Sequence, residues 1–260
     1  DAADYEAGGT GWRQRAKADG EKEPTDDEIF ADYPIMEQDY AGKGEKRQSL
    51  PKPLQRELLL QVIERIRTAK RPVFNAGNGI RIAKGHEAFL QLAELLGIPV
   101  VTGWNSIDAI WDDHPLYVGR AGNMGDRPGN FAIQNSDLVF SVGSRLSIRQ
   151  VGYNYTTWAR EAYVIMNDVD QEELLKPTLH VDLPVHADSR EFMEMLIGQL
   201  RQSEKEGQIT FPLFKGGEGI KNTSWLETCR MWKEKYPVVQ PKHMAHTDQE
   251  PANVYALVKE

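Results

Sequence analysis

The sequence has little cysteine and no long hydrophobic run. A single cysteine, Cys229, occurs among 260 residues. One cysteine excludes a disulfide-stabilised scaffold and a cysteine-based zinc site, and it fits a reducing cytoplasm. No apolar run approaches the roughly 18 residues that a bilayer span needs, and the mean hydropathy is -0.55. We therefore expect a cytoplasmic protein that does not span a membrane.

The chain also lacks an excess of positive charge. It carries 31 basic against 39 acidic side chains, a net charge of -8. Proteins that bind a phosphate backbone usually present a basic face, so no nucleic-acid partner is expected. The first 50 residues hold 13 acidic and 7 basic side chains, which leaves -2 of the net charge for the other 210 residues. This composition predicts an acidic, extended connector over residues 1–53, with one short helical turn near residues 26–30.

The two ends of the sequence suggest a piece of a longer polypeptide. The chain begins Asp1-Ala2-Ala3-Asp4, without Met and without the basic and apolar stretches of a signal peptide. It ends at Val258-Lys259-Glu260, in a pattern typical of the start of a helix. We expect further domains outside this sequence.

From residue 54 onward, short apolar strands alternate with amphipathic helices. Strands are predicted at residues 73–74, 98–101, 138–142, 163–166 and from 179, and helices at residues 54–66, 89–96, 131–136, 172–175 and 192–200. This alternation predicts an α/β domain over residues 54–200, with a parallel sheet covered by helices on both faces. Residues 201–260 are predicted to be a linker followed by a helix at Trp225, which Ser224 and Glu227 open as a capping box.

Glycine-rich loops follow two of these strands, and a third lies at residues 119–125. Gly77-Asn78-Gly79 follows a strand, but Gly85 comes six residues after Gly79. A dinucleotide fingerprint needs a spacing of three residues there, so this motif does not encode one. A strand-to-helix turn that needs glycine explains much of the segment without a ligand. In the second loop, glycines recur every third residue from Gly119 to Gly125. That spacing fits a close approach to a ligand or another domain, or a surface turn.

Charged side chains lie near the ends of two predicted strands. Arg145 and Arg149 follow Gly143, where they suit an anion such as a diphosphate or form surface salt bridges. Asp168 follows the strand at 163–166 and could accept hydrogen bonds from a ribose or an adenine amine. Asp170 and Asp188 each precede a glutamate by three residues, which favours helix capping.

No catalytic machinery is evident in the sequence. His243 and His246 have the spacing of metal ligands on a helix, but their polar surroundings and Pro241 favour a solvated loop. No Gly-x-Ser-x-Gly elbow occurs, and no nucleophile is paired with a base. We therefore expect no catalytic and no metal-binding residue in this chain.

Residues 71–200 nevertheless resemble a known family. The matching elements are Arg71-Pro72-Val73, Gly77-Asn78-Gly79, Leu95-Leu96-Gly97-Ile98-Pro99-Val100, Gly119-x-x-Gly122-x-x-Gly125, Ser136-Asp137-Leu138, Val142-Gly143-Ser144-Arg145 and Lys176-Pro177-Thr178. In order and spacing they are similar to the central domain of thiamine-diphosphate enzymes of the acetolactate (acetohydroxyacid) synthase type. The resemblance implies a Rossmann-like domain with a six-stranded parallel sheet, packed between two thiamine-binding domains that this chain lacks.

The resemblance also implies a cofactor site, because this domain binds FAD or ADP in some members. The matching contact positions are Gly77, Asn78, Gly79, Thr102, Gly122, Asn123, Met124, Gly125, Gly143, Arg145, Arg149, Asp168 and Asp188. FAD-binding members usually carry Phe-Asp-Asp-Arg where this chain has Leu146-Ser147-Ile148-Arg149, and a histidine where it has Met124. These departures favour an ADP-like ligand over FAD.

The resemblance finally implies what the intact enzyme does. It would decarboxylate a 2-keto acid such as pyruvate on thiamine diphosphate with Mg²⁺, pass the carbanion to an acceptor, and form a homodimer or tetramer through the missing domains. The family's metal-diphosphate motif, Gly-Asp-Gly, is absent from this sequence. We therefore expect the chain alone to be inactive. Two alternatives stay open: a free-standing module that binds ADP, FAD or NAD, and a non-catalytic scaffold.

Overall fold

The computed structural model describes residues 53–217, 219 and 223–239. Almost all of the predicted connector, the predicted turn near residue 26, the pair His243 and His246 and the end of the chain lie outside the described residues. What the sequence suggests for those segments stays a prediction.

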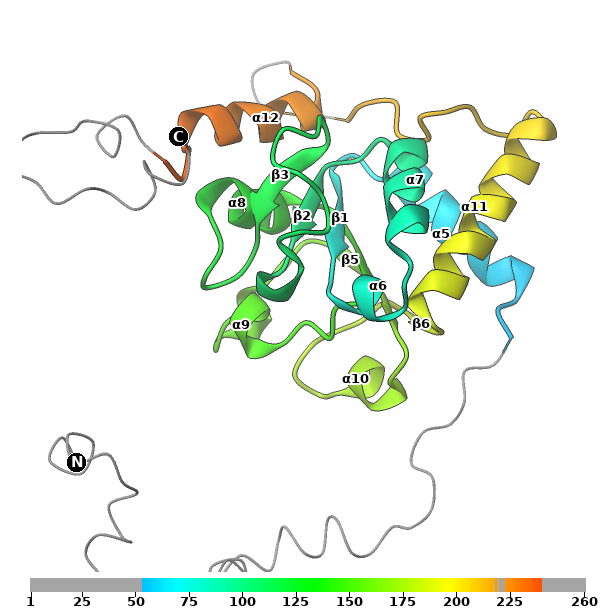
Figure 1. Cartoon of the computed structure of the whole chain (residues 1–260), viewed down its shortest axis with the longest axis horizontal. Helices are drawn as coiled ribbons and strands as arrows, with labels where there is room; N and C mark the ends of the chain where they lie inside the picture. The colour runs from blue at the N-terminus through cyan, green and yellow to red at the C-terminus, as the bar shows by residue number, and fades with distance from the viewer. Residues whose placement is uncertain (1–52, 218, 220–222, 240–260) are drawn as a thin grey trace, which may run out of the picture. The chain divides into compact units, whose positions relative to one another are not determined.

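The centre of the fold is a six-stranded sheet in which every neighbouring pair is parallel (Figure 1). The order is β3-β2-β1-β4-β5-β6. The strands are β1 (Pro72–Ala76), β2 (Val100–Thr102), β3 (Tyr117–Arg120), β4 (Leu138–Val142), β5 (Tyr163–Asp168) and β6 (Leu183–His186). Every residue of the central strands β1 and β4 is buried, as expected where helices cover both faces of a sheet. The predicted α/β class and the six-stranded parallel sheet are confirmed.

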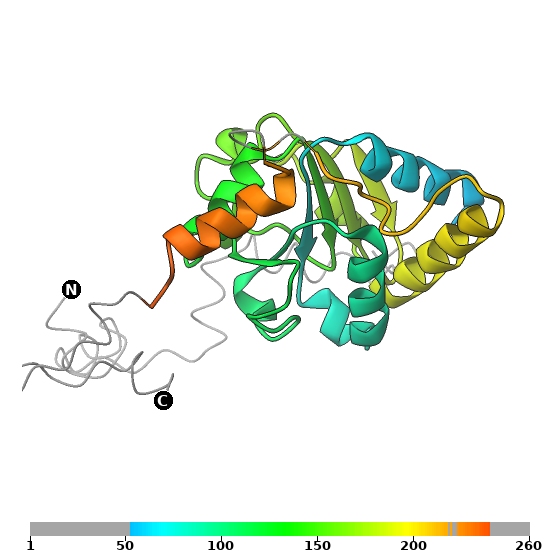
Figure 2. The same cartoon turned by 90° about the horizontal axis from the view of Figure 1, so that it is seen from above.

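Helices pack on both faces of this sheet (Figures 1 and 2). The α-helices of the described residues are α5 (Arg56–Thr68), α6 (Gly79–Ile82), α7 (His86–Leu96), α8 (Arg127–Asn135), α9 (Ile148–Val151), α10 (Gln171–Leu175), α11 (Ser189–Lys205) and α12 (Trp225–Lys235). The longer ones bury one apolar stripe each; α7, for example, buries Phe89, Leu92 and Leu96 and ends at Gly97. No helix in the described part of the chain is long and apolar enough to cross a bilayer.

Both edge strands differ from the sequence-based expectation. The prediction placed Gly119 and Arg120 in a loop, but they belong to β3. The last strand was predicted to begin at Leu179, but β6 runs from Leu183 to His186 and contains Pro184. Proline cannot donate a ladder hydrogen bond, and an edge strand tolerates it because one side of that strand is unpaired. Two helices are also longer than expected, since α8 begins at Arg127 and α11 runs past residue 200 to Lys205.

Residues beyond α11 pack back onto the sheet domain. The Leu213 amide donates to the carbonyl of Leu95 at the end of α7, 2.8 Å away. Trp225 is only 1% exposed, and its indole Nε1 donates to the carbonyl of Pro72 at 2.9 Å. Ser224 and Glu227 form the predicted capping box at the start of α12. The described part of the 201–260 segment therefore shares the core of the sheet domain.

Candidate functional site

The strand order reverses between β1 and β4, so the chain leaves these neighbouring strands in opposite directions. In open α/β sheets such a switch point, at the carboxyl ends of the strands, is where ligands bind. Here the two loops are in direct backbone contact. The Gly77 amide donates to Val142 O at 2.9 Å and the Gly79 amide to Gly143 O at 2.8 Å.

The glycines of these loops are required by that contact. A Cβ atom on Gly77 would lie 2.1 Å from Gly143 O, and one on Gly79 would lie 2.7 Å from Gly143 Cα. Gly143 itself has a φ of +64°, in the left-handed region that favours glycine. The turn that needs glycine, which the sequence suggested for Gly77-Asn78-Gly79, is therefore sufficient to explain the motif.

A cavity of about 600 Å³ opens at this edge of the sheet. Its size falls within the roughly 300–1,000 Å³ that is typical of small-molecule sites. Nine of the thirteen predicted contact residues line it: Gly77, Asn78, Gly79, Met124, Gly143, Arg145, Arg149, Asp168 and Asp188. The fold thus brings most of the predicted residues together, while their contact with a cofactor stays a prediction.

The other four predicted residues do not line the cavity. Gly122 packs against α9, where a Cβ atom would lie 2.6 Å from Arg149 O, and the Asn123 amide donates to the same oxygen at 2.9 Å. Gly125 packs against the end of β3, and Thr102 is fully buried in β2. The close approach that the second glycine loop allows is therefore an approach to the protein's own backbone.

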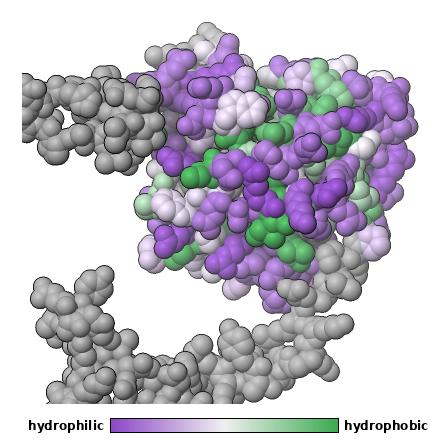
Figure 3. All heavy atoms as spheres, in the orientation of Figure 1, coloured by the Kyte–Doolittle hydropathy of each residue, from purple (hydrophilic) through white to green (hydrophobic). Residues whose placement is uncertain are grey.

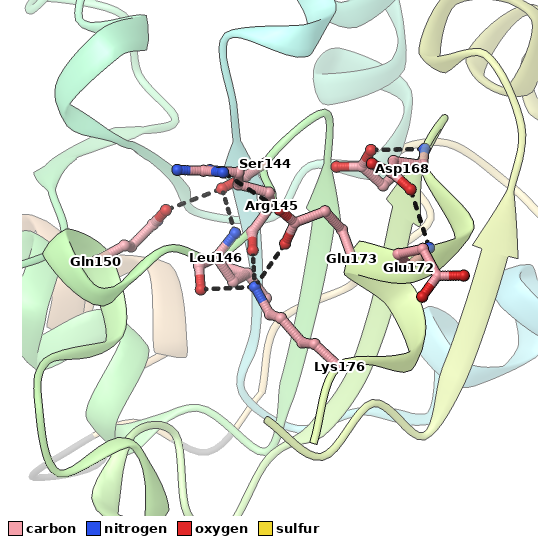
Figure 4. Close-up of polar contacts among 9 residues, drawn as sticks. Ser144, Arg145, Leu146, Gln150, Asp168, Glu172, Glu173 and Lys176 are labelled. Carbon is pink, nitrogen blue, oxygen red and sulfur yellow. Dashed lines mark hydrogen bonds and ion pairs between the residues drawn. The ribbon is translucent and has the colours of Figure 1, made fainter. Parts of the chain in front are cut away.

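The two arginines of the cavity differ in their surroundings. Arg145 Nη1 lies 3.3 Å from Glu173 Oε1 (Figure 4), and 69% of the Arg145 side chain is exposed. Arg149 projects from α9, and no ion pair or side-chain hydrogen bond is found for it within residues 53–217, 219 and 223–239. An anion in the cavity would share Arg145 with Glu173 but would meet Arg149 without a competing carboxylate.

Asp168 is the last residue of β5 rather than the start of a loop. Its Oδ1 accepts a hydrogen bond from the Asp170 amide at 2.9 Å. Burial raises the pKa of the Asp168 carboxyl, and the nearby carboxylates of Glu173 and Asp170 raise it further. A carboxylate has about four acceptor sites, so Asp168 can accept further hydrogen bonds from a ligand.

Asp170 and Asp188 act as helix caps, as their spacing predicted. Asp170 accepts from the Glu172 amide at 2.9 Å, at the start of α10. Asp188 accepts from the amides of Arg190 and Glu191, at 2.9 and 3.1 Å, at the start of α11. Asp188 lines the cavity as well, so capping and a ligand contact are compatible at this residue.

A buried polar network beneath the cavity was missed by sequence reasoning. Asn75 Nδ2 donates to Ser141 Oγ at 2.9 Å, joining β1 to β4. Gln150 Nε2 donates to Asn75 Oδ1 at 2.5 Å, and Ser144 Oγ donates to Gln150 Oε1 at 2.9 Å. Asn75 and Ser141 are fully buried. The available signal was one polar residue inside each of two otherwise apolar central strands.

Of the apolar rim of the cavity, sequence reasoning identified only Met124. Ile82, Trp104, Met124 and Val169 line it with 76%, 49%, 51% and 53% of their surfaces exposed. Figure 3 shows hydrophobic residues gathered near the centre of this face, in the region of α6, within a largely hydrophilic surface. The cavity therefore combines a polar floor with a partly apolar mouth.

The residues present do not fit thiamine diphosphate with its metal ion. No Gly-Asp-Gly motif occurs in the sequence. In the part of the chain that the structure describes, no group of three or more His, Cys, Asp or Glu side chains could hold a metal ion. No step through that cofactor is assigned to residues of this chain.

The strand order and the site at its reversal define a doubly wound α/β domain. Comparison with protein families identifies which one. Residues 59–196 match the family described as "Thiamine pyrophosphate enzyme, central domain", a match that covers more than half of the chain. The protein belongs to this family, and the resemblance drawn from the motifs is confirmed.

Curated relatives agree with this assignment. The chain is 36% identical over 140 residues to a probable acetolactate synthase large subunit of Methanococcus aeolicus, covering 54% of this chain and 23% of the relative. It is 34% identical over 177 residues to the acetolactate synthase large subunit of Corynebacterium glutamicum, covering 68% and 26%. It is also 35% identical over 142 residues to a sulfoacetaldehyde acetyltransferase of Alcaligenes xylosoxydans, covering 50% and 23%. The chain thus spans about a quarter of the length of these relatives.

Proposed function

We propose that the cavity at the switch point binds an ADP-like nucleotide. The observation that carries this proposal is Arg149, a guanidinium without a carboxylate partner among the described residues, beside the cavity at the carboxyl ends of β1 and β4. Arginine suits a diphosphate because its planar fork can donate two parallel hydrogen bonds. The diphosphate would lie near Arg149 and the backbone of the β4–α9 loop.

The charge distribution supports one orientation of that nucleotide. The carboxylates of Asp168, Asp170, Glu173 and Asp188 lie on the side of the cavity formed by β5, α10 and the start of α11. Carboxylates repel a diphosphate but accept hydrogen bonds from ribose hydroxyls and from an amine. We place the nucleoside on this acidic side, with Asp168 as its acceptor.

The segment before Arg149 supports ADP over FAD. Ser147 and Ile148 stand where FAD-binding members of the family carry two aspartates. In the structure Ser147 is the N-cap residue of α9, and Ile148 is 50% exposed. Neither side chain supplies the carboxylates that the family motif offers at these positions.

Isothermal titration calorimetry of the whole chain tests this proposal. ADP is expected to bind more tightly than FAD, and Arg149→Ala should weaken ADP about tenfold or more, since a hydrogen bond to a charged group contributes about 1.5–3 kcal/mol. Arg160→Ala is the matched control, because Arg160 pairs with Glu161 and does not line the cavity. Tight FAD binding that Arg149→Ala leaves unchanged would overturn both the ligand and the contact. Absence of any nucleotide binding would favour the scaffold alternative.

We further propose that the protein serves as the central domain of a homo-oligomeric enzyme that acts on a 2-keto acid such as pyruvate with thiamine diphosphate and Mg²⁺. Its family and its acetolactate synthase relatives support this proposal. One relative is named as a sulfoacetaldehyde acetyltransferase, so similar chains belong to enzymes that are named for different substrates. The test is incubation of the purified chain with pyruvate, thiamine diphosphate and Mg²⁺. No acetolactate is expected from this chain alone. Product above a protein-free control would contradict the proposal that catalysis belongs to the other domains of the enzyme.

A further inference from the structure

The loop between β4 and α9 has a strained backbone at the edge of the cavity. Leu146 has a φ of +47°, although it is a branched residue and only 1% exposed. Non-glycine residues persist in the left-handed region only where their surroundings fix them there, and such positions cluster at ligand sites. Ser144, two residues before Leu146, and Arg149, three residues after it, both line the cavity. The contacts that fix Leu146 therefore also affect the positions of these two cavity residues.

Lys176 holds this loop from one side (Figure 4). It caps the end of α10, and its Nζ donates to the carbonyl of Arg145 and, at 3.2 Å, to the carbonyl of Leu146. The same Nζ lies 3.0 Å from Glu173 Oε2, and only 19% of the Lys176 side chain is exposed. An ammonium has three N–H donors, so these three oxygens use its full capacity.

The buried network holds the loop from the other side. The Leu146 amide donates to Ser144 Oγ at 3.3 Å, and Ser144 Oγ donates to Gln150 Oε1. Gln150 is in turn fixed to Asn75 on β1. The loop is thus connected to the central sheet through Gln150 and to α10 through Lys176.

We propose that Lys176 is a positioning residue for the cavity. It fixes the carbonyls of Arg145 and Leu146 and thereby the direction in which the Arg145 side chain leaves the loop. Lys176 also pairs with Glu173, the same carboxylate that Arg145 contacts. The charge of Glu173 is therefore divided between the two cations. Its effect on nucleotide affinity rests on the proposed function, whereas its effect on the loop does not.

Hydrogen exchange of the whole chain, followed by mass spectrometry without nucleotide, tests the effect on the loop. In Lys176→Met, peptides that cover residues 143–150 should exchange about tenfold faster, because losing a charged donor weakens the local structure. Peptides that cover β1 should keep their wild-type rates. Lys205→Met is the control: it removes the same charge from the exposed end of α11. Unchanged exchange in the loop, or faster exchange throughout the sheet, would overturn a positioning role.

Calorimetry with ADP tests the consequence for the cavity. Lys176→Met should weaken the binding of ADP about tenfold. Lys176→Arg, which keeps a cationic donor to the carbonyls, should retain most of the wild-type affinity. Equal weakening in Lys176→Arg and Lys176→Met would overturn the role of the donor. If the wild-type chain binds no ADP, the proposed function fails, and the exchange experiment alone decides whether Lys176 positions the loop.

Discussion

Replacing Gly77 by alanine tests how the loops after β1 and β4 meet. The new Cβ atom would lie 2.1 Å from the carbonyl oxygen of Gly143, 2.4 Å from its carbon and 2.5 Å from Ser144 Cβ. Two of these atoms belong to backbone, which cannot rotate away. We expect a loss of about 3 kcal/mol in the free energy of unfolding, the upper part of the usual range for overpacking. That loss corresponds to a fall of roughly 6–12 °C in Tm for a protein of this size.

Circular dichroism during heating measures this difference, and Gly198→Ala is the matched control. Gly198 lies within α11, and a Cβ atom there would meet nothing within 4 Å. Alanine should stabilise the chain at this position by about 0.5–1 kcal/mol, because glycine is a poor helix former. A Tm of Gly77→Ala within about 2 °C of wild type would refute the backbone contact between the two loops.

Three further predictions concern Cys229, Trp225 and Asp168. The buried thiol of Cys229, whose pKa burial raises, should resist alkylation at pH 8 in the folded chain and react after unfolding in urea; fast labelling of the native chain would contradict this. Trp225→Phe, which leaves the Pro72 carbonyl without its indole donor, should lower the unfolding free energy by about 1–3 kcal/mol in urea titrations. An unchanged unfolding free energy would contradict the attachment of α12 to the core through this hydrogen bond. Because the folded-state pKa of Asp168 is raised, its ionisation destabilises the fold as pH rises through that pKa. Asp168→Asn should therefore raise Tm at pH 7 and not at pH 3, and it should weaken the binding of ADP. A lower Tm at pH 7 would contradict the destabilising effect of the ionised carboxyl.

The sequence predicted the central strands of the sheet better than its edges. β1, β4 and β5 are largely buried strands made mostly of apolar residues, and such runs are a clear signal of a covered parallel strand. β3 contains Gly119 and β6 contains Pro184, residues that usually disfavour a strand. The structure places both in edge positions, where tertiary pairing overrides these local preferences.

The candidate site was predictable where residues follow strands and unpredictable where side chains meet across the fold. Gly77, Gly143 and Asp168 follow or end a strand, so the parallel sheet brings them to one edge. The pairing of Gln150 with Asn75, 75 positions apart, depends on how the fold brings α9 close to the end of β1. Likewise, Lys176 looked like one element of a family motif, and only the fold shows that it contacts the Arg145 and Leu146 carbonyls.

The location of the nucleotide site is tested most directly by amide NMR of the isotopically labelled chain during titration with ADP. The shifts of Gly77, Gly79, Arg149 and Asp168 should change saturably, while those of α12 stay in place, because the site is proposed at the carboxyl ends of β1, β4 and β5. Saturable shifts confined to α12, or no saturable shift at all, would contradict a nucleotide site at the switch point.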